Sequence, residues 1–293
     1  MEFTQQEITL SDGRVLEVGT YGNPDGKTIL LHHGTPGSYM TFASYAELFK
    51  SNEYFVVSYS RAGYGNSTRN EGRSIASVVS DTTQVLDQLG RTTYLAIGWS
   101  GGGPHSLASA ALDAPRCVGA ICVAGVAPAD VDFDWTEGMG PENIEEFRVA
   151  KEGGPVYEQH MIEARDSFRA VTPETVVDLF GGLLSEADKA AWGDGATSEI
   201  EARDLRHAFK VDRYGFQDDD QAFMKAWGFD VKDITVPVAI WYGDEDLMVP
   251  PTHGQWLVSN IAGAQEHRFA SEGHISIWTN HFPAMSQNIA SFL

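Results

Sequence analysis

The chain is short of basic residues relative to acidic ones. Its 293 residues contain 20 Lys and Arg against 41 Asp and Glu, which gives a formal net charge of -21 at pH 7. Because nucleic acids and anionic membranes are polyanions, this charge argues against both as partners. We expect the acidic side chains to form a solvated surface; a specific cationic partner is the alternative.

The sequence also lacks long apolar runs and has little cysteine. Its longest nearly apolar stretch, residues 117–129, is too short to cross a bilayer and contains Gly and Pro. The first ten residues have neither a basic start nor an apolar core, so we expect no signal peptide. The two cysteines, Cys117 and Cys122, lie in one expected strand. That spacing places them roughly 16 Å apart on opposite faces, which excludes a disulfide and favours a reducing, cytoplasmic location.

Short apolar runs with the length of buried strands alternate with helical patterns along most of the chain. The expected strands cover residues 3–10, 14–21, 27–32, 54–59, 93–99, 118–124, 236–242 and 265–270. The expected helices between and after them cover residues 42–50, 75–89, 104–112, 251–261 and 281–293. This alternation predicts an α/β protein with a doubly wound, mostly parallel sheet of eight strands.

Residues 126–228 interrupt the alternation. They carry several tryptophans, many acidic residues and repeated helix-start signals, such as Ser198 followed by Glu201 at the spacing of a capping box. No strand pattern of comparable strength occurs among them. We therefore expect a domain of five or six helices, inserted into a core domain that consists of residues 1–125 and 229–293.

A G-x-S-x-G pentad at residues 98–102 lies directly between an expected strand and an expected helix. A serine at so sharp a turn takes a strained backbone conformation, and the flanking chains close around Ser100 only if Gly98 and Gly102 lack a Cβ. The helix behind the turn points its first N–H groups at the reacting atoms. The N–H of Gly101 could therefore stabilise a developing oxyanion.

A serine hydroxyl is a weak nucleophile at neutral pH, so Ser100 requires a neighbouring base and a carboxylate that orients the base. His274 fits the base because it lies in a glycine-containing turn just after the strand over 265–270. Asp246 fits the carboxylate because it follows the strand over 236–242. The sequence thus offers Ser100, Asp246 and His274 at the ends of three different strands.

Together these motifs resemble the α/β-hydrolase superfamily, in its capped serine hydrolase branch of esterases and proline iminopeptidase-like enzymes. The similarity extends from about residue 16 to the C-terminus, and the chain order Ser, Asp, His is that of the family. The motifs that carry it are HGTPG at 33–37, RAGYGNS at 61–67, GWSGG at 98–102, GDEDLMVP at 243–250 and GH at 273–274.

The resemblance implies specific roles for five residues. Ser100, His274 and Asp246 would form a catalytic triad, in which His274 takes the serine proton and Asp246 orients His274. The backbone N–H groups of Gly101 and Thr35 would form the oxyanion hole. The resemblance implies no cofactor, and the histidines and carboxylates do not cluster at the spacing of metal ligands.

The sequence leaves alternatives for some of these roles. The family pattern G-x-x-D-x-x-V-P selects Asp246 as the acid, while Asp244 and Asp130 are the alternatives. Arg61 could bind a substrate anion, but we expect it to tie loop carbonyls together. We expect His33 to brace the loop before the oxyanion hole rather than to titrate.

The resemblance predicts hydrolysis of small or medium carboxylic esters through an acyl-enzyme, with a small molecule as the partner. Alternatives are a lactonase, a hydrolase of carbon–carbon bonds, an aminopeptidase, or a sensor without catalysis. Thr35 and Gly101 replace the glycine and the aromatic residue that are usual in proline iminopeptidases, which weakens the peptidase alternative. Ser100 argues against epoxide hydrolases and haloalkane dehalogenases, whose nucleophile is Asp.

Aromatic residues of the cap are candidates for an apolar substrate pocket. A further candidate, Trp99, lies within the pentad itself. The candidates within the cap are Trp135, Phe147, Trp192 and Trp227.

Overall fold

The apolar runs of the chain pair into a single sheet of eight strands within the described residues, which are 4–43, 53–192 and 195–293 of the computed structural model. The strand order is β1-β2-β4-β3-β5-β6-β7-β8. Their bounds are β1 Thr4–Thr9, β2 Val15–Gly22, β3 Lys27–His32, β4 Tyr54–Tyr59, β5 Tyr94–Trp99, β6 Cys117–Val123, β7 Val238–Gly243 and β8 Gln265–Phe269. The helix expected over residues 42–50 lies mostly outside the described residues.

The sheet is parallel except at one edge. Strands β1 and β2 pair antiparallel, as do β2 and β4, whereas the pairs from β4 through β3, β5, β6 and β7 to β8 are all parallel. The carboxyl ends of the parallel strands therefore meet at one edge, where open α/β sheets bind ligands. The expected α/β class and mostly parallel eight-stranded sheet are confirmed.

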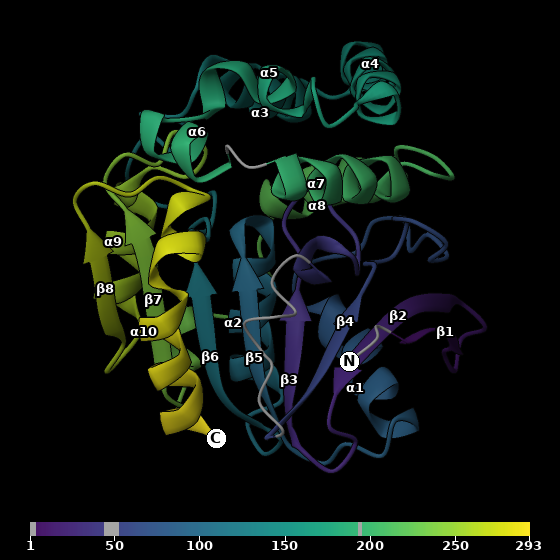
Figure 1. The fold of residues 1–293 in the computed structure, drawn as a ribbon, viewed down its shortest axis with the longest axis vertical. Helices are drawn as coiled ribbons and strands as arrows, with labels where there is room; N and C mark the ends of the chain where they lie inside the picture. The colour runs from purple at the N-terminus through teal and green to yellow at the C-terminus, as the bar shows by residue number, and fades with distance from the viewer. Residues whose placement is uncertain (1–3, 44–52, 193–194) are drawn as a thin grey trace.

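Helices cover both faces of the sheet because its strands are apolar on both sides. In Figure 1, α10 lies in front of the sheet, and α1, α2 and α9 lie behind it. Along β3, Leu30 packs with the layer behind, and its neighbours Ile29 and Leu31 pack with the layer in front. The bounds of these helices are α1 Ser77–Gln88, α2 Gly103–Leu112, α9 Pro251–Asn260 and α10 Ser276–Phe292.

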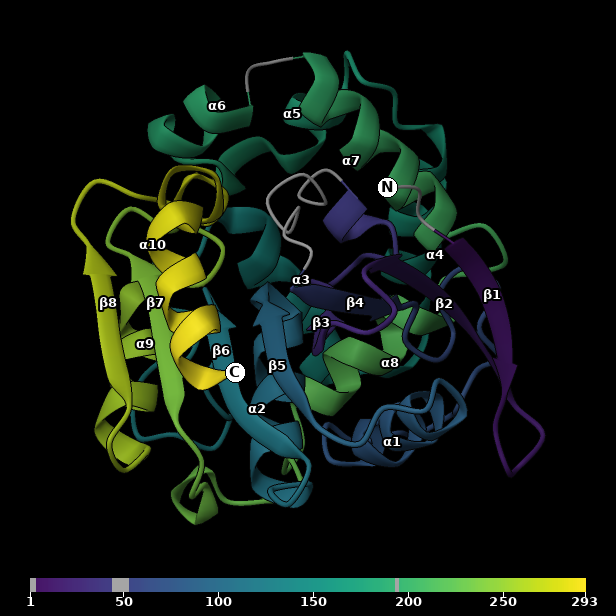
Figure 2. The same cartoon turned by 60° about the horizontal axis from the view of Figure 1, so that its bottom comes forward.

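Six α-helices lie between β6 and β7 in the described part of the chain, in agreement with the five or six expected. They lie above the carboxyl ends of the strands in Figure 1, and in the turned view of Figure 2 α5, α6 and α7 lie at the top. The division of the chain into two domains stays a prediction. The bounds are α3 Pro141–Glu152, α4 Gly154–Ala170, α5 Val176–Phe180, α6 Glu186–Trp192, α7 Gly195–Ala208 and α8 Tyr214–Phe223.

The expected placement of the two cysteines on opposite faces of β6 is wrong. The thiols are free and buried, and both pack with the apolar layer behind the sheet. The pairing of β5 with β6 shifts register, because Tyr94 pairs with Cys117 but Leu95 pairs with Gly119. This bulge inserts one residue into β6, so strict alternation is broken and both thiols point the same way.

The last helix begins five residues earlier than expected, at Ser276 instead of His281. Pro283 therefore lies inside α10, rather than in a first turn where its missing N–H costs nothing. The earlier start brings the N-terminus of α10 within two residues of His274. The beginning of this helix thus belongs to the neighbourhood of the candidate site.

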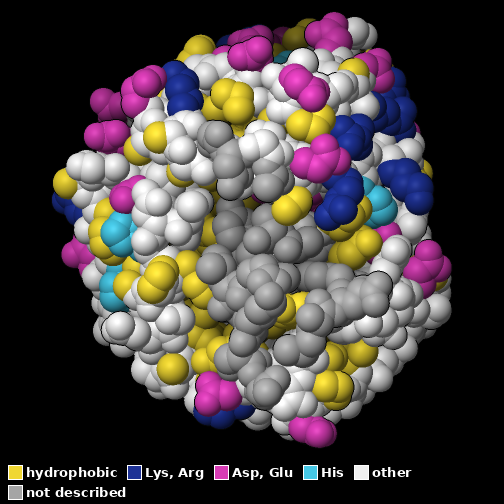
Figure 3. Space-filling model, in the orientation of Figure 1, with side chains coloured by type: hydrophobic (Ala, Val, Ile, Leu, Met, Phe, Trp, Pro, Cys, Tyr) yellow, Lys and Arg dark blue, Asp and Glu magenta, His cyan; other side chains and the backbone are white. Residues whose placement is uncertain are grey.

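Acidic side chains are spread around the face of the molecule in Figure 3, and Lys and Arg gather toward one side of it. Some acids pair along a helix, as Glu145 and Glu152 do with Arg148 on α3. Exposed pairs of this kind add little to stability. Among the helices of the described residues, none combines the length and apolar character that crossing a membrane requires.

Candidate active site

Ser100 lies at the turn from β5 into α2, and its backbone has φ 55°. A residue with a Cβ adopts this left-handed conformation only where the surroundings impose it. The two flanking glycines are required by close packing of the chain. A Cβ on Gly98 would lie 2.1 Å from the carbonyl oxygen of Gly102, and one on Gly102 would lie 2.1 Å from that of His32. The pentad therefore forms the strained turn that its sequence predicts.

His274 and Asp246 are buried and bonded to each other. His274 Nδ1 lies 2.8 Å from Asp246 Oδ2. The other carboxylate oxygen of Asp246 accepts the backbone N–H groups of Met248 and Val249 at 2.8 and 2.7 Å. A carboxylate partner assigns the ring proton to Nδ1 and leaves the lone pair of the imidazole on Nε2. His274 can therefore act as a base through Nε2.

The alternative acids lie elsewhere. Asp244 forms an ion pair with Arg268, at 2.7 Å from its Nε. Asp130 lines a separate cavity together with Trp227. Of the three carboxylates considered from the sequence, Asp246 is the one that the structure brings to His274.

Ser100 and His274 line one small cavity, together with Trp99 and Thr35. A larger cavity of about 510 Å³ also reaches Ser100, Thr35 and Gly101. Much of the wall of the larger cavity comes from helices of the insertion and is apolar. Its phenyl rings are those of Phe147, Phe168, Phe180, Phe216 and Phe223.

The loop after β3 brings Thr35 against the Ser100 turn. A Cβ on Gly101 would lie 2.2 Å from Thr35 Oγ1, so the two residues are in close contact. Both line the large cavity beside Ser100. The two residues predicted for an oxyanion hole are therefore neighbours in the lining of the same cavity.

Asp246 changes the proton affinity of His274. Burial alone would lower the pKa of His274, but the carboxylates of Asp246 and, to a smaller extent, Asp188 outweigh burial and raise that pKa above its ordinary value of 6.5. A base whose pKa is raised in this way takes a proton more readily from a hydroxyl.

The aromatic residues predicted to bind substrate are divided among different cavities. The Trp99 ring lies 5.6 Å from the ring of His274, and its Nε1–H donates to the His274 carbonyl at 3.2 Å. Phe147 lines the large cavity, and Trp192 lines the small one. Trp135 lines neither; it lines a third cavity, and its Nε1–H donates to the carbonyl of Ala127 at 2.8 Å.

Three further histidines lie near Ser100 and are buried. His32 Nδ1 lies 2.8 Å from the Tyr59 hydroxyl. His33 Nε2 accepts the backbone N–H of Arg61 at 3.0 Å, which confirms the bracing position expected for it. Burial lowers the pKa of His105 to about 4, and it lowers those of His32 and His33 well below the ordinary value. Across the described residues, no group of His, Cys, Asp and Glu could hold a metal ion.

Asp188 is a site residue that the sequence did not identify. It lies on α6, and its carboxylate accepts the backbone N–H groups of His274, Ile275 and Ser276 at 3.1, 2.7 and 3.0 Å. Asp188 lies three residues after Ser185, a spacing typical of a helix start, and Ser185 Oγ accepts the Asp188 N–H at 3.2 Å. This local spacing does not indicate that the Asp188 carboxylate also caps the distant helix α10.

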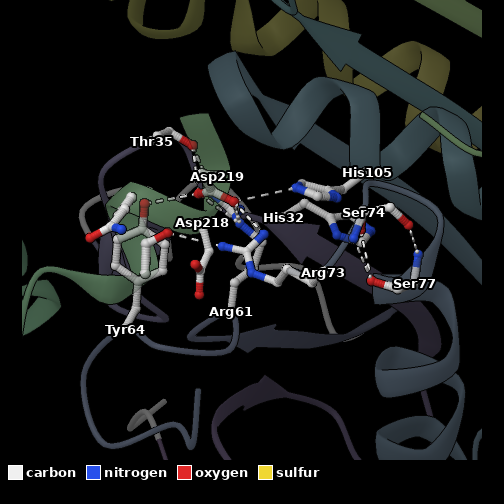
Figure 4. A network of polar contacts seen from close by, with 12 residues as sticks. His32, Thr35, Arg61, Tyr64, Arg73, Ser74, Ser77, His105, Asp218 and Asp219 are labelled. Carbon is white, nitrogen blue, oxygen red and sulfur yellow. Dashed lines mark hydrogen bonds and ion pairs between the residues drawn. The ribbon is translucent and has the colours of Figure 1, made fainter. Parts of the chain in front are cut away.

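Asp219 is a second residue that the sequence did not identify. It lies on α8, and in Figure 4 it meets side chains from several segments that are distant in sequence. Its carboxylate forms ion pairs with two fully buried arginines, Arg61 and Arg73, each at 2.6 Å. Arg61 also donates to the carbonyl oxygens of His33 and Gly34, so its predicted role in tying loop carbonyls is confirmed.

Comparison with known proteins is consistent with this geometry. The family described as the alpha/beta hydrolase fold matches residues 27–281. A non-heme chloroperoxidase of Streptomyces lividans is 30% identical over 49% of this chain. The match covers 53% of that relative, so this chain spans about half of its length. A non-heme haloperoxidase of Rhodococcus erythropolis is 26% identical over 83% of this chain and 82% of its own. The solved esterase RhEst1 from Rhodococcus sp. ECU1013 has a TM-score of 0.70 and 19% identity over all of both chains, a likeness of fold.

Proposed function

The chain belongs to the alpha/beta hydrolase fold family, and on this basis we propose that it is a serine hydrolase that cleaves small or medium carboxylic esters. Membership of this family supports a hydrolase activity. One observation carries the serine mechanism: Ser100 lies at φ 55° in a cavity that it shares with His274, whose Nδ1 is bonded to Asp246. A strained serine beside an oriented imidazole is the arrangement that nucleophilic catalysis requires.

The reaction has two steps on Ser100. Its Oγ attacks the ester carbonyl while His274 Nε2 takes the hydroxyl proton, and the carbonyl oxygen becomes an oxyanion held by the N–H groups of Gly101 and Thr35. The C–O bond to the alcohol then breaks, and the alcohol leaves with the proton from His274. Water then loses a proton to His274 and attacks the acyl-enzyme carbonyl. The bond from that carbonyl to Ser100 Oγ breaks, Oγ takes the proton back from His274, and the acid leaves.

The large cavity supports an apolar acyl or alcohol group in the substrate. Its volume of about 510 Å³ lies in the range of sites for small molecules, and its phenyl walls exclude water from such a group. The overall acidity of the chain disfavours anionic substrates.

Pre-steady-state kinetics with p-nitrophenyl esters of increasing acyl length test the proposal. We expect a burst of p-nitrophenol equal to the enzyme concentration and an optimum chain length set by the cavity. Folded protein that gives no burst with any ester and does not react with a fluorophosphonate would overturn the serine mechanism. If Ser100 reacts with a fluorophosphonate but no ester gives a burst, Ser100 is still the nucleophile. The substrates to test next are then lactones, diketone acids and amino-acyl arylamides.

The pH dependence of kcat/KM is expected to follow the raised pKa of His274. Only the neutral imidazole accepts the Ser100 proton, so activity is lost as the pH falls through the pKa of His274. Because Asp246 raises that pKa, the midpoint of the acid limb should lie above 6.5. The check is to measure kcat/KM from about pH 5 to 9 with an ester that has no ionisable group in this range. A midpoint below 6.5 would contradict the assignment of His274 as a base paired with Asp246.

A further inference from the structure

The N–H of Thr35 and the carbonyl of Gly34 belong to the same peptide group, which is planar. Because the two groups of a trans peptide point in opposite directions, whatever holds the Gly34 oxygen also sets the direction of the Thr35 N–H. Two donors hold that oxygen. They are Arg61 Nη2 at 2.8 Å and His33 Nδ1 at 2.7 Å.

The protonation of His33 follows from its two contacts. Its Nε2 accepts the backbone N–H of Arg61, so the ring proton lies on Nδ1 and is donated to Gly34. His33 is fully buried, and burial holds its pKa well below the ordinary value, which keeps the ring neutral. The Gly34 carbonyl thus has a fixed neutral donor and a charged one.

The charged donor, Arg61, depends on Asp219. Its side chain is fully buried and donates to Asp219 through Nε and Nη2, the latter at 2.6 Å from Oδ2. The same Oδ2 accepts the hydroxyls of Thr35 and Tyr64, each at 2.8 Å. Figure 4 shows Asp219 between Arg61, Tyr64 and Thr35. A single carboxylate therefore holds Thr35 directly and, through Arg61, the peptide that precedes it.

Asp219 lies 184 residues after Thr35 in the sequence, on helix α8 of the insertion. We propose that Asp219 is a positioning residue for the oxyanion hole: it fixes the Thr35 N–H through the Thr35 hydroxyl and through Arg61. This inference rests on the proposed ester hydrolysis and assigns part of its transition-state stabilisation to the insertion. The insertion then contributes to the rate of the chemical step as well as to the shape of the pocket.

Asp219→Asn is the direct test, with Asp218→Asn as the matched control. Asparagine keeps the shape of the side chain but removes the charge that holds Arg61. Removal of one oxyanion donor lowers kcat by roughly 10²- to 10³-fold. In Asp219→Asn the Thr35 N–H remains but is free to turn, so we expect kcat to fall by about 10- to 100-fold and KM to change little. Asp218 is the preceding residue on α8 and pairs with Arg69 at 2.8 Å, so its variant should retain the wild-type kcat.

An inhibitor separates positioning from general damage. A trifluoromethyl ketone adds the Ser100 oxygen to its carbonyl and forms an oxyanion in the same hole. Its Ki should therefore rise in Asp219→Asn in proportion to the loss of kcat/KM, and it should not change in Asp218→Asn. If both variants keep the wild-type kcat and Ki, the inference is overturned.

Thr35 provides a second test in case Asp219→Asn does not fold, as circular dichroism would reveal. Thr35→Val keeps the shape and removes the hydroxyl, whereas Thr35→Ser keeps the bond to Asp219. We expect Thr35→Val to lose about 10-fold in kcat and Thr35→Ser to lose less. Equal losses would overturn the inference. A wild-type enzyme that gave neither an ester burst nor fluorophosphonate labelling would instead refute the proposed function, so the two failures are distinguishable.

Discussion

Ser100→Ala is expected to lower kcat for p-nitrophenyl esters by about 10⁵-fold or more, because the acyl-enzyme cannot form without the nucleophile. Alanine keeps the Cβ and removes a single hydroxyl, and the tight contacts of the turn are those at Gly98 and Gly102, so the neighbouring groups should remain in place. The melting temperature should therefore stay close to that of the wild type. Burst kinetics and fluorophosphonate labelling, both on protein shown to be folded, measure the loss.

The residual activity of Ser100→Ala is informative. Oxyanion stabilisation and substrate binding alone leave some acceleration over water in enzymes of this type. A variant that retained more than about a hundredth of the wild-type kcat would refute Ser100 as the nucleophile. Ser106→Ala, on the helix α2 that follows the Ser100 turn, is the matched control. Its hydroxyl donates to the Gly103 carbonyl inside the fold, so this substitution should affect stability rather than the burst.

Asp188→Ala is expected to lower the free energy of unfolding by about 3–5 kcal/mol, the second large effect. The substitution removes the acceptor of three backbone N–H groups, those of His274, Ile275 and Ser276. Buried donors without an acceptor carry their full desolvation cost, and the carboxylate also favours the N-terminus of α10. Urea or thermal unfolding measures the change. Because one of the three groups belongs to His274, kcat should fall as well.

Glu186→Ala is the control for Asp188→Ala. Glu186 lies on the same helix, is exposed, and pairs with Lys189 at 2.8 Å. An exposed pair contributes at most about 1 kcal/mol, so the control should unfold close to the wild type. If both variants lost the same small amount of stability, Asp188 would not stabilise the start of α10.

The strands and the Ser100 turn could be predicted from the sequence because local physics determines them. Strands β3, β4 and β5 are apolar runs buried on both faces, and their observed bounds differ from the predicted ones by at most one residue. The turn at Ser100 requires glycine on both sides, which is visible as spacing. Asp246 followed from the resemblance, whose pattern G-x-x-D-x-x-V-P selects it over Asp244, and the structure brings it to His274.

Asp188 and Asp219 could not be predicted because their partners are distant in sequence. Each lies on a helix whose local pattern is that of an ordinary polar face, and each carboxylate is buried only because another segment packs against it. The bulge in β6 was hidden for a related reason. An extra residue in a strand is recognised from the register of the partner strand, and the run over residues 117–124 is apolar throughout, so its sequence does not mark the extra residue.

Exchange of the segment between β6 and β7 is an obvious way to give this fold a new specificity. In this chain the exchange would also remove Asp188 and Asp219, which bond to the His274 loop and to Arg61 outside that segment. A chimera with a foreign segment would have to supply an acid at both places or redesign the loops that they hold. Recombination at the ends of this segment is therefore constrained by two carboxylates, whatever pocket the new helices form.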